Sequence, residues 1–275
     1  MASKLKPIFL SDPYSGYYHR EIPREDDEIT HVGPGTPCGE WFRRFWHPIA
    51  YSHELDDLPH SIRILGEDLV LFRDGSGNVG LLELHCSHRG TSLEFGLIEK
   101  EGLRCCYHGW MFGVDGRILD TPGEPPDSTY KERLCHGAYP VHEHKGMVWA
   151  YMGPPEKLPP FPRYDIFELP GYELTLGRKS TMPCNWLQLV DNLMDPIHTT
   201  FLHTRSSGVQ FLMDDGRPSP EYGVLPELDW IETRFGMICL ATRRIGDDVW
   251  VRVSDRIHSD MHHFSGHPVF PPDYE

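Results

Sequence analysis

Hydrophobic positions in the first half of the chain fall in short runs with strand-like rather than helical spacing. Turn residues separate these runs, for example Asp74-Gly75-Ser76-Gly77-Asn78. Short apolar runs bounded by glycine-rich turns predict β-strands joined as hairpins. We therefore expect a small all-β domain over residues 41–152. The runs span residues 61–65, 68–73, 79–84, 103–107, 110–114 and 147–151.

The pattern changes after a proline-rich stretch. Five prolines fall within residues 153–163, which predicts an extended, stiff linker. Beyond it, Tyr172–Leu176 indicates a strand, Asn185–Met194 a helix, and residues 223–264 several more strands. We expect a mixed α+β domain over residues 164–275. Residues 1–40 show neither period, so we expect an N-terminal arm there.

Composition and charge narrow the class of protein. Asp and Glu number 41 against 26 Lys and Arg, a formal net charge of −15 that repels phosphate backbones and anionic lipid surfaces. The chain has neither an apolar run of 18 residues nor the apolar segment of a secretory signal. We expect a cytoplasmic protein that binds neither nucleic acid nor membrane. Of its seven cysteines, we expect Cys38, Cys135, Cys184 and Cys239 to pack as small buried hydrophobes.

Two cysteine and histidine motifs provide the first candidate chemistry. They read Cys86-Ser87-His88-Arg89-Gly90 and Cys105-Cys106-Tyr107-His108-Gly109. Two thiolates and two imidazoles at these spacings can hold a binuclear iron–sulfur cluster, with sulfur ligands on one iron and nitrogen ligands on the other. A zinc site is the alternative. The short Cys-x-His spacing, and a glycine close behind each motif, favour the cluster. We expect Cys106 not to be a ligand.

A second candidate site follows the predicted helix, as Asp195-Pro196-Ile197-His198 and then His203. On a regular α-helix, five residues turn through about 500°, which leaves the two imidazoles about 140° apart. The helix must therefore be irregular if both bind one metal. Asp195 as N-cap and Pro196 at the first helical position can end one helix and begin another. The alternative is an amphipathic helix followed by two unrelated histidines.

These motifs resemble those of the Rieske non-haem iron ring-hydroxylating oxygenases, α subunit. The segments Gly66–Arg73 and Cys184–Gln188 resemble the phthalate-dioxygenase-like branch in particular. The resemblance implies an all-β Rieske [2Fe-2S] domain followed by a helix-grip-type, START-like α+β catalytic domain. Residues 122–126 resemble a proline loop that shields such a cluster, or they form an ordinary surface turn. The implied ligands are Cys86, His88, Cys105 and His108 for the cluster, and His198 and His203 for a mononuclear Fe(II).

The resemblance also implies a function. The chain would be an oxygenase component that uses O₂, and electrons from a separate NAD(P)H-dependent reductase, to hydroxylate or O-demethylate an aromatic substrate, with a carboxylated one favoured. It would form a homo-oligomer such as a trimer, in which Asp195 bridges to the partner subunit's His108. Asn192 would belong to the same catalytic segment. The alternative is a Rieske electron-transfer or regulatory protein without oxygenase activity.

One part of the family pattern is missing from the expected place. The third iron ligand is a carboxylate well beyond the paired histidines, but only 72 residues follow His203 in the 275-residue chain. Asp255 and Asp260 are available, although we expect both to be solvated. We therefore expect a C-terminally truncated form of the family. An arginine could clamp a substrate carboxylate, but we expect surface positions for the three candidates, Arg205, Arg243 and Arg244.

Overall fold

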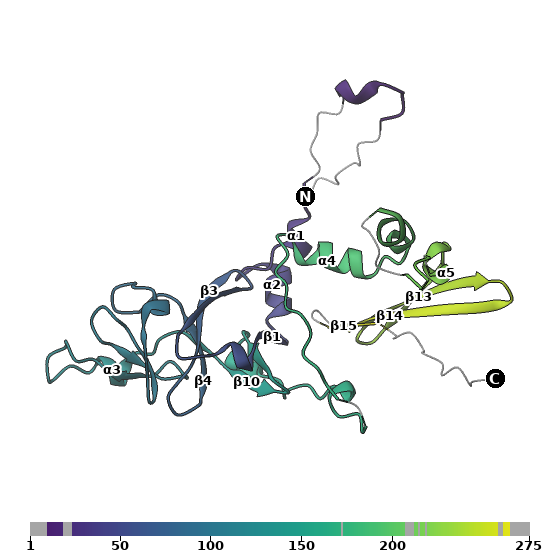
Figure 1. The fold of residues 1–275 in the computed structure, drawn as a ribbon. Coiled ribbons are helices and arrows are strands. Elements are labelled where there is room, and N and C mark those ends of the chain that lie inside the picture. Colours follow the sequence, from purple (N-terminus) through teal and green to yellow (C-terminus); the bar gives the residue numbers. More distant parts are fainter. Residues whose placement is uncertain are drawn as a thin grey trace.

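Three small antiparallel sheets form the part of the chain between Trp46 and Tyr151 (Figure 1). The computed structural model describes residues 10–18, 24–171, 173–206, 212–213, 215–217, 219–257 and 261–264. The first sheet has the order β1 (Trp46–Tyr51), β11 (Met147–Tyr151), β10 (Val141–His144). The second has the order β2 (His60–Ile64), β3 (Glu67–Arg73), β4 (Val79–Glu83), β9 (Ala138–Tyr139). The third has the order β5 (Leu97–Glu99), β6 (Gly102–Arg104), β7 (Met111–Phe112), β8 (Ile118–Asp120).

The predicted hairpin is the one between β3 and β4. Asp74 closes its turn, because one carboxylate oxygen accepts hydrogen bonds from the amides of Ser76 at 3.0 Å and Asn78 at 2.8 Å. Gly77 has a φ of 90°, which glycine adopts without strain. The predicted runs at 103–107 and 110–114 are shorter strands than expected, because the residues between them form a loop.

The hydrophobic core of this β domain has two main parts. One part lies between the first two sheets and includes Leu69, Leu71, Leu81 and Val148, all at most 1% exposed. The other lies under the third sheet and includes Cys86 and Cys105 beside large apolar side chains. The two cysteines are therefore anchored in the core. The apolar members of this second part are Val70, Phe72, Leu82, Leu84, Leu93, Leu103, Trp110, Phe112 and Ile118.

The proline-rich segment packs against the β domain. The indole nitrogen of Trp46 donates to the carbonyl of Pro159 at 3.2 Å. The ring of Phe161 lies 5.6 Å from that of Trp46 and 5.5 Å from that of Trp149. These aromatic contacts fix the direction in which the chain leaves the first domain.

A fourth sheet, with the order β12, β13, β14, β15, forms the second part of the fold. Three helical segments lie over one face of it (Figure 1). The predicted strand at Tyr172–Leu176 is wrong, because the described residues 173–176 have no regular structure and are largely exposed. The strands are β12 (Glu227–Thr233), β13 (Gly236–Ile245), β14 (Asp248–Ile257) and β15 (Met261–Phe264). The helical segments are α4 (Trp186–Leu193), the π-helix η6 (Thr199–Ser206) and α5 (Pro220–Gly223).

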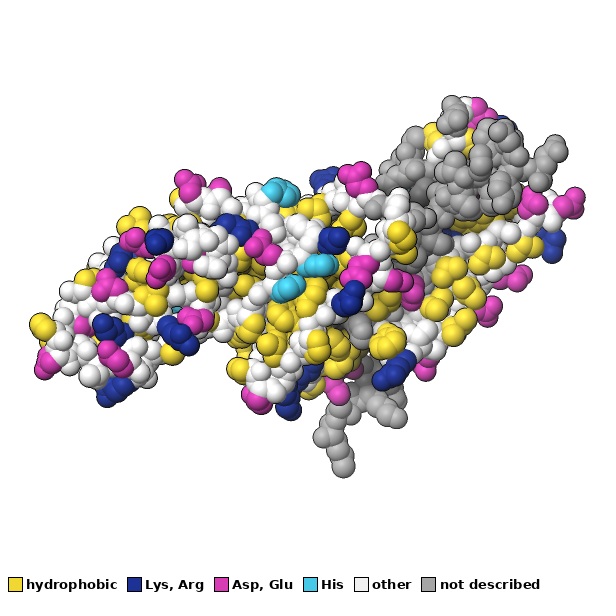
Figure 2. All heavy atoms as spheres, turned by 90° about the horizontal axis from the view of Figure 1, so that it is seen from below, with side chains coloured by type: hydrophobic (Ala, Val, Ile, Leu, Met, Phe, Trp, Pro, Cys, Tyr) yellow, Lys and Arg dark blue, Asp and Glu magenta, His cyan; other side chains and the backbone are white. Residues whose placement is uncertain are grey.

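The opposite face of this sheet is apolar and exposed. Ile231, Val249 and Val251 are between 47% and 55% exposed, and Figure 2 shows hydrophobic side chains along this side. Strand residues alternate between the two faces of a sheet. The face that carries the helices therefore holds the other half of each strand, including Cys239, Ala241 and Arg243, which are all buried.

The N-terminal arm contains short helices. One of them, α1 (Asp27–Thr30), contacts the start of α4: the side chain of Asn185 donates to the carbonyl of Thr30 at 2.8 Å, and the indole of Trp186 donates to that of Ile29 at 3.1 Å. The arm thus links the two parts of the fold.

The remaining helices of the described chain are short. They are η1 (Ser15–Tyr18), α2 (Pro37–Phe42), η2 (Ser52–Glu54), η3 (Leu93–Phe95), α3 (Tyr130–Arg133), η4 (Pro155–Lys157) and η5 (Asp165–Phe167).

Across the described ranges, every helix is too short or too polar to cross a lipid bilayer.

All seven cysteines are free, and Cys239 is buried as expected. The expectation was wrong for Cys135 and Cys184, which are exposed because they lie in segments outside the strands. Cys38 is half-buried.

Candidate metal centres

The first ligand loop follows β4 and is closed by its own backbone. The amide of Cys86 donates to the carbonyl of Thr91 at 2.9 Å, and the amide of Gly90 donates back to the carbonyl of Cys86 at 2.8 Å. Gly90 has a φ of 73°, in the left-handed region that favours glycine. His88 lies between these two bonds. The glycine in this motif therefore serves the tight turn that presents the two candidate ligands.

The second ligand loop repeats this pattern between β6 and β7. The amide of Cys105 donates to the carbonyl of Trp110 at 2.8 Å, and the amide of Gly109 donates to the carbonyl of Cys105 at 3.1 Å. Gly109 has a φ of 77°. The two loops thus share one hydrogen-bond pattern, in which residue i bonds to residues i+4 and i+5. Cys106, beside the candidate ligand, is exposed.

The two loops bring like ligands together. Cys86 and Cys105 are each 3% exposed, and their thiols lie within hydrogen-bonding reach of each other. The rings of His88 and His108 are 4.8 Å apart, and His88 stacks on Trp110 at 4.8 Å with an interplanar angle of 2°. The candidate sulfur ligands therefore meet on the core side, and the candidate nitrogen ligands meet on the outer side. This asymmetric set fits a Rieske cluster.

Burial favours the neutral forms of Cys86 and His88 in the absence of metal. Burial raises the pKa of Cys86 to about 11, and the neighbouring Cys105 contributes a smaller increase. Burial also lowers the pKa of His88, and the neighbouring His108 contributes a smaller decrease. A neutral imidazole is already in the ligand form, whereas a thiol must lose its proton to bind iron. Metal binding at this site therefore releases thiol protons.

The proline loop lies directly against the second ligand loop. A Cβ added to Gly109 would lie 2.9 Å from the Cγ atom of Pro122, so the two segments are in close contact. From the same loop, a carboxylate oxygen of Glu124 lies 3.8 Å from Nε2 of His88. These contacts favour the shielding loop over an ordinary surface turn.

Arg104 is a supporting residue that motif spacing did not reveal. Its guanidinium donates to the carbonyl of Gly109 at 2.7 Å, to a carboxylate oxygen of Asp120 at 2.8 Å and to one of Glu99 at 2.8 Å. The hydrogen bonds with Glu99 and Asp120 raise the pKa of Arg104. One side chain therefore joins the second ligand loop to β5 and β8.

The second candidate site begins where α4 ends. Asn185 caps the start of this helix by accepting from the amide of Leu187 at 3.0 Å. After Leu193 the helix stops, and a carboxylate oxygen of Asp195 accepts from the amide of Ile197 at 2.8 Å. The break therefore lies where the sequence predicted it. The helix that follows becomes a π-helix over Thr199–Ser206.

The π-helix explains how the two histidines meet. Its hydrogen bonds join residue i to residue i+5, and its wider turn brings side chains five residues apart closer to one face than an α-helix does. The rings of His198 and His203 have their centroids 5.0 Å apart. The spacing that is unfavourable on an α-helix is thus suited to the helix type that the chain adopts.

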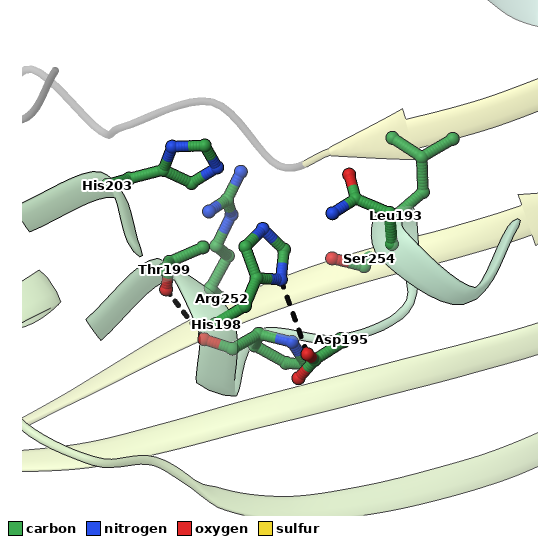
Figure 3. A pocket seen from close by; sticks show the side chains of 9 residues that line it. Leu193, Asp195, His198, Thr199, His203, Arg252 and Ser254 are labelled. Carbon is green, nitrogen blue, oxygen red and sulfur yellow. Dashed lines mark hydrogen bonds and ion pairs between the residues drawn. The ribbon is translucent and has the colours of Figure 1, made fainter. Parts of the chain in front are cut away.

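A cavity of about 160 Å³ lies beside the two histidines (Figure 3). Asp195 is the one carboxylate among its lining residues, and its oxygen lies 3.4 Å from Nδ1 of His198. This contact leaves the other ring nitrogen of His198 for a metal. The lining residues are Asn192, Leu193, Asp195, Pro196, His198, Thr199, His203, Arg252 and Ser254.

A third protein ligand does not appear at this pocket within the described ranges. Asp255 follows Ser254 on β14 and therefore points to the other face of the sheet, and Asp260 lies outside the described residues. Within the described ranges, three ligand atoms lie within 4.8 Å of one another at a different place, the exposed group Glu25, Asp27 and His31.

Two arginines lie on the sheet face that carries the helices. Arg252 lines the pocket, whereas Arg243 is 2% exposed and donates from Nε to the carbonyl of Val224 at 2.9 Å. Both terminal nitrogens of Arg243 are buried without a hydrogen-bond partner. Burial lowers the pKa of Arg243, and the nearby Arg252 contributes a smaller decrease. The expected surface position was therefore wrong for Arg243, and correct for Arg205 and Arg244, which are exposed.

Comparison with known proteins agrees with this geometry. Residues 45–140 match the profile of the Rieske [2Fe-2S] domain. The chain is 48% identical over 250 residues to the tert-butanol monooxygenase / tert-amyl alcohol desaturase oxygenase subunit of Aquincola tertiaricarbonis, covering 88% of this chain and 53% of the relative. It is 41% identical over 273 residues to phenoxybenzoate dioxygenase subunit alpha of Ectopseudomonas oleovorans, covering 94% and 64%.

The solved structures give the same class. Dicamba monooxygenase bound to 3,6-dichlorosalicylic acid aligns with a TM-score of 0.60 and 28% identity, over 73% of this chain and 55% of that one. The chain is thus a Rieske protein with a [2Fe-2S] cluster and an α+β second domain. More narrowly, it belongs to the Rieske non-haem iron oxygenases, α subunit. It spans between about half and two thirds of the length of the two curated relatives described above.

Proposed function

We propose that this chain acts in the oxygenase component of a Rieske non-haem iron system. The reaction is hydroxylation or O-demethylation of an aromatic substrate with O₂ and electrons from a separate NAD(P)H-dependent reductase. One observation carries the proposal: the same chain has a cluster site and a distinct pair of histidines that a π-helix brings together. A protein that only transfers electrons needs the first site alone, which disfavours the alternative.

The proposed ligands follow the geometry of the two sites. When bound, the cluster supplies single electrons, and the mononuclear iron supplies the centre at which O₂ reacts. The neighbouring imidazoles of His198 and His203, whose planes lie at 70° to each other, fit two adjacent positions on such an iron. The proposed cluster ligands are Cys86, His88, Cys105 and His108, and the proposed iron ligands are His198 and His203.

Asp195 has two roles in the proposal. Within the chain its carboxylate lies 3.4 Å from Nδ1 of His198, where its charge favours a ring orientation that leaves the other nitrogen for iron. Between chains it meets the partner subunit's His108. The two sites lie at opposite ends of the molecule (Figure 1): the cluster loops lie beside α3, and the histidine pair lies between α4 and α5. A homo-oligomer such as a trimer would place the two kinds of centre next to each other.

The pocket wall supports an anionic aromatic substrate. Arg252, from β14, lines the cavity beside His198 and His203 (Figure 3), and the nearby Arg243 adds a second positive charge. A guanidinium binds a carboxylate through paired, charge-assisted hydrogen bonds. Asn192 also lines the cavity and offers an amide to the same ligand. A carboxylated aromatic therefore fits this wall better than a neutral alcohol.

The experiment measures metal content and turnover on the same sample. We expect three irons and two acid-labile sulfides per chain, a Rieske electron paramagnetic resonance signal, and oxygenated product from NADH, a reductase and a panel of aromatic acids. Two irons with a normal Rieske signal and no product would instead support the electron-transfer alternative. Such a result would also show that the two histidines need a ligand that the chain does not supply.

The proposal includes a location and an assembly. We propose a cytoplasmic homotrimer that meets its reductase as a separate protein. The names of the relatives, which are oxygenase subunits, support a separate electron donor. Light scattering of the purified chain tests the trimer, and a monomer at micromolar concentration would contradict it.

A further inference from the structure

His136 connects the first ligand loop to the rest of the β domain. Its side chain is 3% exposed, and its ring lies 4.5 Å from that of Phe112. Nε2 lies 2.8 Å from the carbonyl oxygen of Glu83, at the end of β4, and Nδ1 lies 3.2 Å from the hydroxyl of Ser87. Its backbone amide donates to the carbonyl of Gly116 at 2.7 Å. The residue is therefore paired at three places on three segments.

The partners of the ring define its tautomer. A carbonyl oxygen can only accept, so Nε2 of His136 must carry the proton that bonds to Glu83. In the neutral ring, Nδ1 is then an acceptor, and the hydroxyl of Ser87 is its donor. Burial lowers the pKa of His136, which agrees with a neutral ring.

Ser87 lies in the first ligand loop at a position where its side chain can affect both neighbouring candidate ligands. It stands between the candidate ligands Cys86 and His88, and its side chain is otherwise exposed to solvent. The hydroxyl is thus the point at which a buried side chain holds the segment joining a sulfur ligand to a nitrogen ligand. Residues around the ligands of a metal site commonly fix ligand orientation and solvent access.

We propose that His136 is a positioning residue for the iron–sulfur cluster, holding the first ligand loop through Ser87 and so helping to set the reduction potential of the cluster. The potential of such clusters depends on hydrogen bonding around the sulfurs and on solvent exposure. The reduced cluster carries one more negative charge, so water that enters beside a loosened loop stabilises it and raises the potential. The inference requires the cluster alone and is independent of the proposed oxygenase activity.

A double-mutant cycle on the midpoint potential tests this inference in the cluster-loaded chain. Ser87→Ala and His136→Leu remove the same hydrogen bond from its two ends. We expect both variants to shift the midpoint potential upwards by similar amounts, and the double variant to show no further shift. His136→Asn should restore a potential near that of the wild type, since an amide oxygen near the position of Nδ1 can accept from Ser87.

A matched control separates positioning from general stability. His47 is another buried histidine of the β domain, 6% exposed and 2.7 Å from the carbonyl of Phe42. His47→Leu should lower the melting temperature without changing the potential. Additive shifts in the cycle, an unchanged potential in Ser87→Ala, or an equal shift in His47→Leu would each overturn the proposal. Ser87 lies at the surface, so its variant remains informative even if His136→Leu does not fold.

Discussion

The two candidate metal centres differ in what holds their proposed ligands. At the cluster end, long-range packing positions two loops, with the thiols embedded in the core and Arg104 and His136 attached from other segments. At the other end, a local change of helix type positions the two histidines, and α4, just before them, has no fully buried residue. The first site should therefore be coupled to the stability of its domain. The second should tolerate the loss of a ligand with little effect on folding.

The largest expected effect comes from a cysteine ligand. Cys105→Ser replaces a thiol that is 3% exposed and paired with Cys86, so we expect loss of the whole cluster. Iron and sulfide analysis, visible absorption and the melting temperature measure the result. The melting temperature should fall together with the cluster, because the ligand loops belong to the core. A variant that kept a normal cluster would show that Cys105 is not a ligand.

Removal of a histidine ligand tests the other half of the comparison. His203→Ala should abolish the mononuclear iron and the product, while the Rieske signal stays unchanged. We expect the free energy of unfolding to fall by no more than about 1 kcal/mol, because His203 is only half-buried. Metal analysis and denaturant unfolding measure both. Loss of the cluster in this variant would contradict the independence of the two sites.

Asp195 should affect communication more than binding. Asp195→Ala should leave both metals bound and yet stop product formation, because the proposed bridge between subunits is gone. The rate at which O₂ reoxidises a chemically reduced cluster, in the presence of substrate, measures the step directly. Thr204→Ala, on the same π-helix but not lining the pocket, is a suitable control. Full turnover in Asp195→Ala would show that the bridge is wrong.

Much of the fold could be predicted because its signals are local. The β3–β4 hairpin follows from Asp74 and Gly77 in its turn, and the end of α4 follows from Asp195 and Pro196. Arg104 and His136 could not be found in this way, because their partners depend on how distant segments pack. The burial of Arg243 was missed for the same reason, since its strand face is set by the helices above it.

Arg104 should show a moderate effect on the cluster end. Arg104→Lys keeps the charge but loses the geometry that joins Gly109, Asp120 and Glu99. We expect a loss of about 1–2 kcal/mol in unfolding free energy, allowing for partial exposure of the network, and faster loss of the cluster on storage. Arg117→Lys, an exposed pair with Asp115, provides the control. Equal behaviour of the two variants would contradict the role given to Arg104.

The smallest expected effect is a pH dependence in the β domain. Arg73 donates to both carboxylate oxygens of Glu143, at 2.9 and 2.7 Å, and this lowers the pKa of Glu143. The stabilisation is therefore complete above the unfolded pKa of about 4.3 and disappears as pH falls through the lower folded value. Glu143→Gln should remove at most about 1 kcal/mol at pH 7.

Urea unfolding of the wild type and Glu143→Gln between pH 3 and pH 7 measures this difference. The two curves should converge at the acid end of that range. A difference that stayed constant with pH would show that Glu143 contributes by packing rather than by charge.

The π-helix over Thr199–Ser206 couples the backbone conformation of this segment to metal binding. If the segment relaxed to an α-helix, His203 would turn to about 140° from His198 and the pair could no longer bind one ion. A ligand that binds one conformer shifts the population towards it, by as much as its affinities for the two conformers differ. A metal that both histidines bind therefore stabilises the π-helical conformation. Amide hydrogen exchange across this segment should slow when the metal binds.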